Sequence, residues 1–281
     1  KKNILITEGV SGGIKNILES IVINRKTDVI IPKPSFALYE IYSKIFGIKF
    51  NTFSYDKYFN LDINKIYNLV SKNTAIVFLP FPNIPIEGSL KLKSIEKLIN
   101  FLNKKKILIA IDEVYHPFNK STTINLIKKY NNLIVMRSFS KAYGLAGARI
   151  GYIVSNKDKI KIFSRTKGGY ETNMLSASCI HFILDNIKIT KKYTNEIKKG
   201  FYHLKKELNN MKINFYGGDN SNFIYINFKS PKIARKIYNK LKSKKIIVRY
   251  GYEAPFNNGI ILTGCPPKEM KKFIFAFKKI I

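Results

Sequence analysis

Three residues that could bind an anion and one lysine amine lie close together in the middle of the chain. The anion-binding candidates are Ser138, Ser140 and Arg149, and the amine is that of Lys141. Small and hydroxyl-bearing neighbours around Lys141 suit an amine that is held in a tight polar pocket. Two serine hydroxyls and the planar donor fork of an arginine can together bind a phosphate. The segment follows an apolar run, Leu133–Met136. It therefore predicts a phosphate site next to a lysine amine, at the end of a strand.

A second group of candidate residues follows the apolar run Ile107–Ile111. Asp112 comes directly after this run, and a carboxylate at the end of a buried strand costs free energy unless a cation meets it. A pyridinium nitrogen would be such a cation. Tyr115 can point its hydroxyl into the same cleft. Two alternatives stay open, since Asp112 could instead cap a following helix, and His116 could be purely structural.

The elements that must position these residues alternate between short apolar runs and amphipathic stretches. The predicted strands are Ile4–Thr7, Val29–Ile31, Ala75–Leu79, Ile107–Asp112 and Leu133–Met136, and the predicted helices are Ile14–Ile23, Phe36–Phe46, Ile63–Val70 and Ser94–Asn103. This alternation predicts an α/β fold with a mostly parallel central sheet flanked by helices. In such sheets functional residues gather at the carboxyl ends of the strands.

The rest of the chain predicts a long helical region and a small α+β unit. The helical region is Ser176–Asn209, interrupted near Asp185–Asn186. After it we expect strands at Phe223–Asn227, Ile246–Arg249 and Ile260–Thr263, and helices at Pro231–Lys242 and Lys268–Ile280. The predicted domains are residues 1–190, with the chemistry, and residues 191–281.

The net charge of +32 in 281 residues admits two interpretations. A nucleic-acid-binding protein would carry such a charge, but lysine supplies nearly all of it and is spread over many predicted surfaces. A bias in residue usage is therefore the favoured interpretation, and neither a nucleic-acid nor a membrane partner is expected. Cys179 and Cys265 lie far apart and have no metal-ligand spacing, so we expect no metal and a cytoplasmic location.

Two motifs carry a resemblance to a known family. The chain has D-E-V-Y at Asp112–Tyr115 and S-K-A-Y-G-L-A-G-A-R at Ser140–Arg149. These resemble the fold-type-I aminotransferases (class I/II) that depend on pyridoxal 5'-phosphate (PLP), in particular the histidinol-phosphate aminotransferase branch. The likeness extends over essentially the whole chain, and the second motif is much more specific than the first.

The resemblance implies a role for each candidate residue. Lys141 would hold PLP in a Schiff base and move a proton during transamination, while Asp112 would keep the pyridine nitrogen protonated. Tyr115 would hydrogen-bond the phenolic oxygen of the ring, and Phe36 would stack on the ring. The phosphate would be bound by Gly9, Val10 and Ser11, at the turn before the first helix, together with Ser138, Ser140 and Arg149. By their type, Phe36 could equally be core and Ser11 a helix cap.

Two departures from the family pattern affect the site. Ile84 aligns with the family asparagine that contacts the ring, so either Asn83 takes its role through a one-residue slip of the loop, or Tyr115 alone contacts the phenolic oxygen. Ile260 falls at the position of an arginine that binds the substrate α-carboxylate, whereas Arg249 matches a second anion-binding arginine. We therefore hypothesise that the substrate is a phosphorylated or otherwise anionic amine, bound differently from an ordinary α-amino acid.

The resemblance also implies a homodimer with sites near its interface. Tyr170 and Asn173 match a family stretch close to that interface and are candidate substrate-binding residues. The family usually carries an N-terminal arm before the part that corresponds to Ile4–Gly9, and this arm is absent from the sequence. A fragment, a fused portion and a degenerate enzyme are the open explanations.

Transamination through Lys141 is the favoured function. The alternatives are a PLP-dependent decarboxylase of a phosphorylated amino acid, a catalytically weakened PLP-binding homologue, and a nucleic-acid-binding protein that reuses the fold. The substrate and the pathway cannot be read from the sequence.

Overall fold

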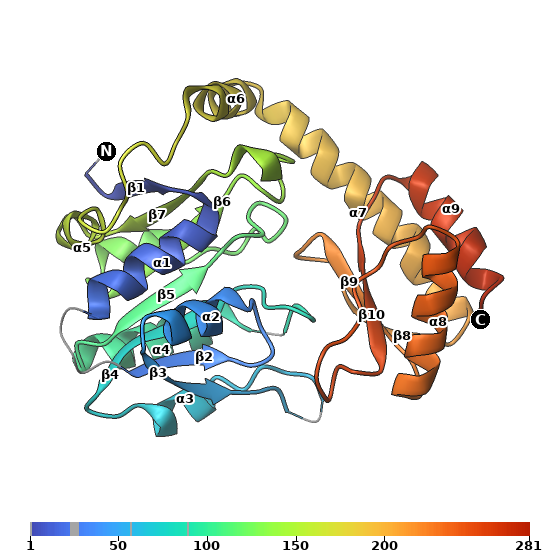
Figure 1. The fold of residues 1–281 in the computed structure, drawn as a ribbon, viewed down its shortest axis with the longest axis horizontal. Coiled ribbons are helices and arrows are strands. Elements are labelled where there is room, and N and C mark those ends of the chain that lie inside the picture. Colours follow the sequence, from blue (N-terminus) through green and yellow to red (C-terminus); the bar gives the residue numbers. More distant parts are fainter. Residues whose placement is uncertain (1, 23–27, 57, 89) are drawn as a thin grey trace. The chain divides into compact units, whose positions relative to one another are not determined.

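The computed structural model describes residues 2–22, 28–56, 58–88 and 90–281 (Figure 1). The chain divides into two compact units. The first comprises Lys1–Ile84 and Gly88–Asn186, and the second comprises Pro85–Glu87 and Ile187–Ile281. The predicted boundary near residue 190 falls a few residues into the second unit and stays a prediction for functional domains.

The first unit is built on a seven-stranded sheet. Its strands are β1 (Ile4–Thr7), β2 (Asp28–Pro32), β3 (Lys49–Phe53), β4 (Thr74–Pro80), β5 (Leu108–Asp112), β6 (Leu133–Ser138) and β7 (Gly151–Ser155). They lie in the order β1-β7-β6-β5-β4-β2-β3. The pairs from β3 to β6 are parallel, and β7 runs antiparallel to both β6 and β1. This confirms the mostly parallel central sheet.

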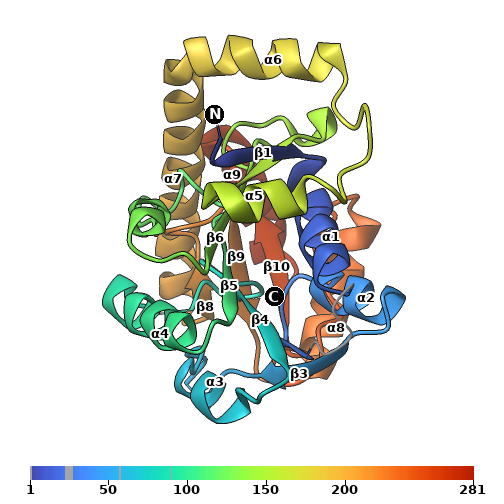
Figure 2. The same ribbon diagram turned by 90° about the vertical axis from the view of Figure 1, so that its left-hand side faces the viewer.

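Helices cover both faces of this sheet. The helices of the unit are α1 (Gly9–Val22), α2 (Leu38–Ile45), α3 (Asn64–Leu69), α4 (Leu92–Lys104), α5 (Lys157–Phe163) and α6 (Met174–Asp185), with short 3-10 turns η1 (Ile124–Lys128) and η2 (Ala146–Ala148), and α6 lies away from the sheet. Figure 2 shows α1 and α2 on one side of the strands and α4 on the other. Side chains from α1, α2 and α5 share one buried cluster with alternate residues of the strands.

Strand alternation decides which face each candidate residue occupies. In β5, Leu108 and Ala110 pack into the cluster under α1 and α2. Because successive side chains of a strand point to opposite faces, Asp112 lies on this same face, and Glu113 is directed to the other. In β6, Ile134 and Met136 belong to the same cluster, so Ser138 shares the face of Asp112.

Helix α1 begins earlier than its sequence predicted. The expected start was Ile14, and the structure starts the helix at Gly9; the expected last residue, Ile23, lies outside the described residues. Glycines have low helix propensity, which hid this first turn in the sequence. Here tertiary packing decides, because a Cβ on Gly151 would lie 2.7 Å from the backbone of Gly9. Ser11 is therefore inside the first turn and is not the cap.

The elements of the first unit that were not predicted include β3 and α5. Strand β3 has mostly polar or half-exposed residues at the sheet edge, and α5 is only seven residues long. Both therefore lack the long apolar periodicity on which prediction from sequence depends. The helical region after residue 173 was predicted with its interruption, which separates α6 from α7.

The second unit contains a three-stranded antiparallel sheet and three helices. They are β8 (Asn214–Gly217), β9 (Phe223–Asn227), β10 (Gly259–Thr263), α7 (Ile187–Asn210), α8 (Pro231–Ser243) and α9 (Pro267–Lys278). The predicted strand Ile246–Arg249 was wrong, since only Arg249 pairs with β10, as an isolated bridge to Ile261. Ile247 is 76% exposed and Val248 is 7% exposed, so the run buries one side chain but does not pair along its length with the sheet.

In the part of the chain that the structure describes, no helix combines the length and the apolar character needed to span a membrane.

Candidate active site

Asp112 ends β5 as a buried carboxylate with two hydrogen-bond donors. The hydroxyl of Tyr39, on α2, donates to Oδ2 at 2.5 Å, and the backbone N–H of Val114 donates to Oδ1 at 3.0 Å. A turn follows the strand, so Asp112 closes a turn and does not cap a helix. Burial raises the pKa of Asp112 to about 6, and the Tyr39 hydrogen bond opposes this rise. The carboxylate is thus poised to gain from a cationic partner.

Lys141 lies near this carboxylate, in the turn after β6. Its Nζ is 5.8 Å from the centroid of the Tyr115 ring, and its positive charge lowers the pKa of Asp112. Tyr115 is 8% exposed. The structure therefore brings together the three residues that the sequence predicted as catalytic.

The predicted phosphate-binding residues also assemble in the first unit. The Ser138 hydroxyl donates to Ser140 Oγ at 2.9 Å, and the Ser140 N–H donates to Ser138 Oγ at 3.0 Å. Gly9, with a φ of +63°, starts α1, and a Cβ there would lie 3.3 Å from Nη2 of Arg149. The guanidinium therefore lies against the N-terminus of a 14-residue helix, where backbone N–H groups attract anions.

A side chain at position 9 would press on this arginine, so the close approach requires glycine. Gly151, paired with Ser138 in the sheet, packs directly on the Gly9 backbone and ties the serines to the helix end. Val10 is buried, whereas Ser11 is partly exposed. Hydroxyls, a guanidinium and a helix N-terminus form a donor set that fits a phosphate.

Phe36 and Asn83 lie near the Asp112 side of the site, but they differ in whether their side chains are free to contact a cofactor ring. Phe36 is 37% exposed and contacts Tyr39 edge to face, with centroids 6.0 Å apart, so it is not core. The Asn83 amide donates to Tyr55 Oη at 2.6 Å and to the Pro34 carbonyl at 3.0 Å. Both amide N–H donors are thus used within the protein, and a ring contact by Asn83 stays a prediction that requires rearrangement.

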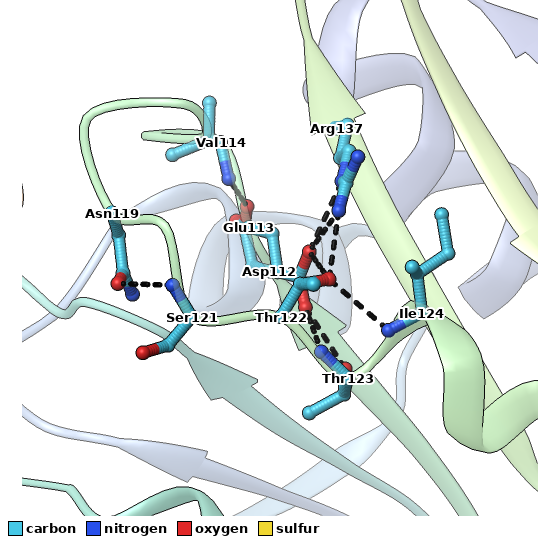
Figure 3. A network of polar contacts seen from close by, with 9 residues as sticks. All are labelled: Asp112, Glu113, Val114, Asn119, Ser121, Thr122, Thr123, Ile124 and Arg137. Atoms are coloured by element: carbon cyan, nitrogen blue, oxygen red, sulfur yellow. Dashed lines mark hydrogen bonds and ion pairs between the residues drawn. The ribbon is translucent and has the colours of Figure 1, made fainter.

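A buried network beside Asp112 was missed by sequence reasoning (Figure 3). Glu113 is 1% exposed, and its Oε2 accepts hydrogen bonds from Arg137 Nε at 3.0 Å and Nη2 at 2.8 Å. Oε2 also accepts from the Thr122 hydroxyl at 2.7 Å, and Oε1 accepts from the backbone N–H of Thr123 at 2.6 Å. The network fixes the segment after β5 to β6.

The same network accounts for the environment of His116. Burial and the nearby Arg137 charge lower the His116 pKa, and Glu113 opposes them. His116 is therefore favoured in its neutral form, which fits a structural residue. A signal for this network was present in the sequence, because a second acidic residue follows Asp112 at the end of a buried strand and needs a cation of its own.

Tyr170 and Asn173, the predicted substrate-binding residues before α6, are an exposed side chain and a helix cap. Tyr170 is fully exposed, at 104% of the reference area, and has a φ of +62°. Asn173 is the cap of α6, where its side chain accepts from the Ser176 N–H at 2.8 Å. Both stay predictions as substrate-binding residues.

Arg249 and Ile260 belong to the second unit. The Arg249 guanidinium carbon lies 4.8 Å from the centroid of the Tyr252 ring. Ile260 is fully buried in β10, opposite Ile226 of β9, so it is a core residue at this position. Among the residues that the structure describes, no group of three His, Cys, Asp or Glu side chains could hold a metal ion.

Comparisons with known proteins agree with this geometry. Residues 1–276 match the family model of aminotransferase class I and II. The chain is 31% identical over 256 residues to histidinol-phosphate aminotransferase of Methanococcus aeolicus, covering 89% of this chain and 67% of the relative. It is 31% identical over 284 residues to the enzyme of that name from Christiangramia forsetii, covering 99% of this chain and 79% of the relative.

The fold is that of the PLP-dependent transferases. A solved histidinol-phosphate aminotransferase from Sinorhizobium meliloti, in complex with pyridoxal-5'-phosphate, superposes with a TM-score of 0.88 at 23% identity. The superposition covers 99% of this chain and 76% of that chain. The residues here fit PLP, since they offer a lysine amine, a buried carboxylate and a phosphate-binding helix end. The chain belongs to the class I and II aminotransferases and is a PLP-dependent transaminating enzyme.

Proposed function

We propose that this aminotransferase takes its amino group from histidinol phosphate or a closely similar phosphomonoester amine. The supporting observation is that two relatives of that name are 31% identical to the chain over most of its length. Arg249 adds chemical support, because its planar donor fork suits a phosphate and its guanidinium is exposed beside Tyr252.

The first unit supports a role for each residue toward the cofactor. When bound, PLP supplies an electron-withdrawing ring that makes the substrate Cα–H bond acidic. We propose that Lys141 Nζ would hold the cofactor through a Schiff base. Once the substrate amine has displaced it from the cofactor, the freed Lys141 amine would take up the Cα proton and return it. Asp112 keeps a proton on the ring nitrogen, and Tyr115 hydrogen-bonds the phenolic oxygen, with Asn83 as a second candidate donor.

The phosphate of the cofactor is assigned to the donors at the start of α1. Its ligands in this proposal are Ser138, Ser140, Arg149 and the backbone of Gly9, Val10 and Ser11. The support is the approach of Arg149 to the helix N-terminus and the hydrogen-bonded serine pair. Phe36 stacks on the ring, for which its exposed position before α2 is suitable.

Arg249 binds the anionic group of the substrate in this proposal, and Tyr170 and Asn173 are further candidates for contact with it. We also propose a homodimer, supported by large exposed apolar side chains on and before α6: Tyr170, Met174, Leu175, Phe182 and Leu184. A set of large exposed apolar side chains on one segment is typical of an interface. The corresponding location in this proposal is the cytoplasm, where the protein would act as a biosynthetic enzyme.

The substrate proposal is tested by steady-state transamination kinetics. Purified protein with PLP is assayed with L-histidinol phosphate and 2-oxoglutarate, and in parallel with unphosphorylated histidinol and ordinary α-amino acids. We expect kcat/KM to be highest for the phosphorylated amine. Arg249→Ala should lower kcat/KM for that amine by about 10- to 100-fold, roughly the value of a charge-assisted hydrogen-bonded pair.

The matched control is Arg235→Ala, which removes an exposed arginine of the same unit on α8. It should leave kcat/KM unchanged. Equal kcat/KM values for histidinol phosphate and histidinol would refute the substrate class. Release of CO2 from a phosphorylated amino acid, without amino transfer, would favour the decarboxylase alternative instead.

The lysine assignment is tested by the visible absorbance of the protein with added PLP. Lys141→Ala should abolish the lysine-dependent band, while Lys157→Ala, at an exposed lysine on α5, should retain it. A band of unchanged position and intensity in Lys141→Ala would exclude Lys141 as the attachment site.

A further inference from the structure

Tyr39 contributes a hydroxyl to the centre of the cofactor site although it lies 73 residues before Asp112. It is fully buried on α2, and its hydroxyl donates to Asp112 Oδ2 at 2.5 Å. The Tyr39 ring packs on Phe78 of β4, with centroids 5.0 Å apart, and contacts Phe36 edge to face. A single side chain therefore touches the carboxylate proposed for the ring nitrogen and the aromatic ring proposed to stack on it.

In the hydrogen bond between Tyr39 and the ionised Asp112, the Tyr39 hydroxyl is the donor and the carboxylate is the acceptor. Burial, followed by the charge of Asp112, raises the pKa of Tyr39 well above its ordinary value, so the phenol stays protonated and donates. The other carboxylate oxygen accepts from the Val114 N–H. Asp112 is thus held by one donor at each oxygen, one from its own turn and one from a different element of the fold.

We infer that Tyr39 is a positioning residue of this aminotransferase, which acts through Asp112 by holding its carboxylate ionised and oriented for a protonated ring nitrogen. The inference rests on the proposed role of Asp112. Tyr39 does not itself need to touch the cofactor ring or the substrate.

The physical reason lies in the burial of Asp112. A carboxylate that is removed from water favours its neutral form, and a neutral carboxyl group cannot hold a positive ring nitrogen by charge. The Tyr39 hydrogen bond favours the ionised form, because a hydroxyl donates more strongly to a carboxylate than to a carboxylic acid. Without this donor, Asp112 would be protonated at a higher pH, and cofactor binding would weaken there.

Three titratable groups act on Asp112 from the surrounding elements, and a fourth, Tyr115, acts on Tyr39. Tyr39 faces Asp112 from α2, Glu113 and Tyr115 follow it in the chain, and Lys141 comes from the turn after β6. Glu113 is paired with Arg137, and the Lys141 charge is altered when that amine binds PLP. Tyr39 is the side-chain donor to Asp112 in the structure, beside the backbone N–H of Val114.

The experiment measures PLP affinity against pH for the cofactor-free dimer or monomer as purified. Increasing PLP is added at each pH between 5 and 9, and the dissociation constant is taken from the visible band, so no catalytic turnover is needed. The variants are Tyr39→Phe, Asp112→Asn and the double variant. Tyr39→Phe keeps the ring and its packing and removes only the hydroxyl.

In Tyr39→Phe we expect the acid limb of PLP affinity to move to higher pH by about one unit, as loss of one hydrogen bond to a charged group implies. Near pH 6 the dissociation constant should rise about tenfold, and the profiles should converge toward pH 9. Ionisation of PLP itself is common to all variants and cancels in the comparison. In the Asp112→Asn background, Tyr39→Phe should produce no further shift.

The matched control is Tyr42→Phe, which removes a hydroxyl one turn later on the same helix. Its profile should superimpose on that of the wild type. A purely structural role of Tyr39 predicts a loss of affinity that is equal at every pH and persists in the Asp112→Asn background. That result, or an unshifted Tyr39→Phe profile, would overturn the inference alone. An unshifted Asp112→Asn profile would overturn the proposed role of Asp112, and the inference with it.

Discussion

The buried pair of Glu113 and Arg137 offers the sharpest test of how the site is held. Arg137→Met keeps most of the side-chain volume but removes both hydrogen bonds to Glu113 Oε2. Glu113 is 1% exposed, and it would remain as a buried charge without its cation. Removal of one partner of a buried ion pair costs about 3–5 kcal/mol, so we expect a loss of that size in the free energy of unfolding.

The assay is urea unfolding of the cofactor-free protein at pH 7, followed by far-ultraviolet circular dichroism. The reference is Lys129→Met, which breaks the exposed ion pair with Glu96 at 2.9 Å. In that pair the two side chains are 64% and 35% exposed, so water screens them, and we expect a loss below about 1 kcal/mol.

A double variant separates the buried charge from lost packing. Glu113→Gln in the Arg137→Met background removes the unpaired charge but keeps an oxygen that can accept from Thr123, so it should recover about half of the lost stability. The reasoning would be refuted if Arg137→Met cost no more than Lys129→Met, or if the second substitution added to the loss.

Three further predictions concern Asp112, the phosphate site and the second unit. In the cofactor-free protein the pKa of Asp112 is raised from 3.8 to about 6, so ionising it costs stability as the pH rises through that window. In urea unfolding between about pH 4 and pH 6, the stability of Asp112→Asn should therefore increase relative to that of the wild type as the pH rises. A difference in stability that is the same at every pH would contradict the raised pKa. Arg149→Lys should weaken PLP affinity about tenfold in the absorbance titration, because an ammonium cannot replace a planar fork, and unchanged affinity would remove Arg149 from the phosphate site. A Cβ at Gly200 would collide with the Cys265 carbonyl oxygen, whereas one at Gly169 meets open space. Thermal unfolding should therefore show a loss of stability of about 1–3 kcal/mol for Gly200→Ala and almost none for Gly169→Ala. Similar melting temperatures of the two variants would contradict this and would show that the backbone around Gly200 can shift.

Much of the proposed cofactor site followed from the sequence because its residues occupy short local segments. Asp112 and Tyr115 come directly after an apolar run, and Ser138, Ser140 and Lys141 follow another. Because parallel strands present their carboxyl ends at one edge, the period of the apolar residues was enough to place these groups together. The family resemblance then supplied the roles that we propose for them.

The elements that prediction missed are those without a strong apolar period. Strand β3 is an edge strand with few buried residues, and the glycine-rich first turn of α1 has low intrinsic helix propensity. Conversely, the apolar run Ile246–Arg249 looked like a strand, but it reaches the sheet only at its last residue, through a single bridge. In each case packing against other parts of the chain overrode the local signal.

By itself, the sequence determined the type of fold, the lysine and carboxylate proposed for the cofactor site, and the departures from the family pattern at the proposed substrate-binding positions. Only the tertiary structure decided which partners these groups have. The Tyr39 hydroxyl reaches Asp112, Arg137 neutralises Glu113, and Arg149 lies against Gly9, each across a long interval of chain. Such contacts depend on sheet order and helix placement, which local periodicity does not encode, and they decide whether buried charges are stabilised or costly.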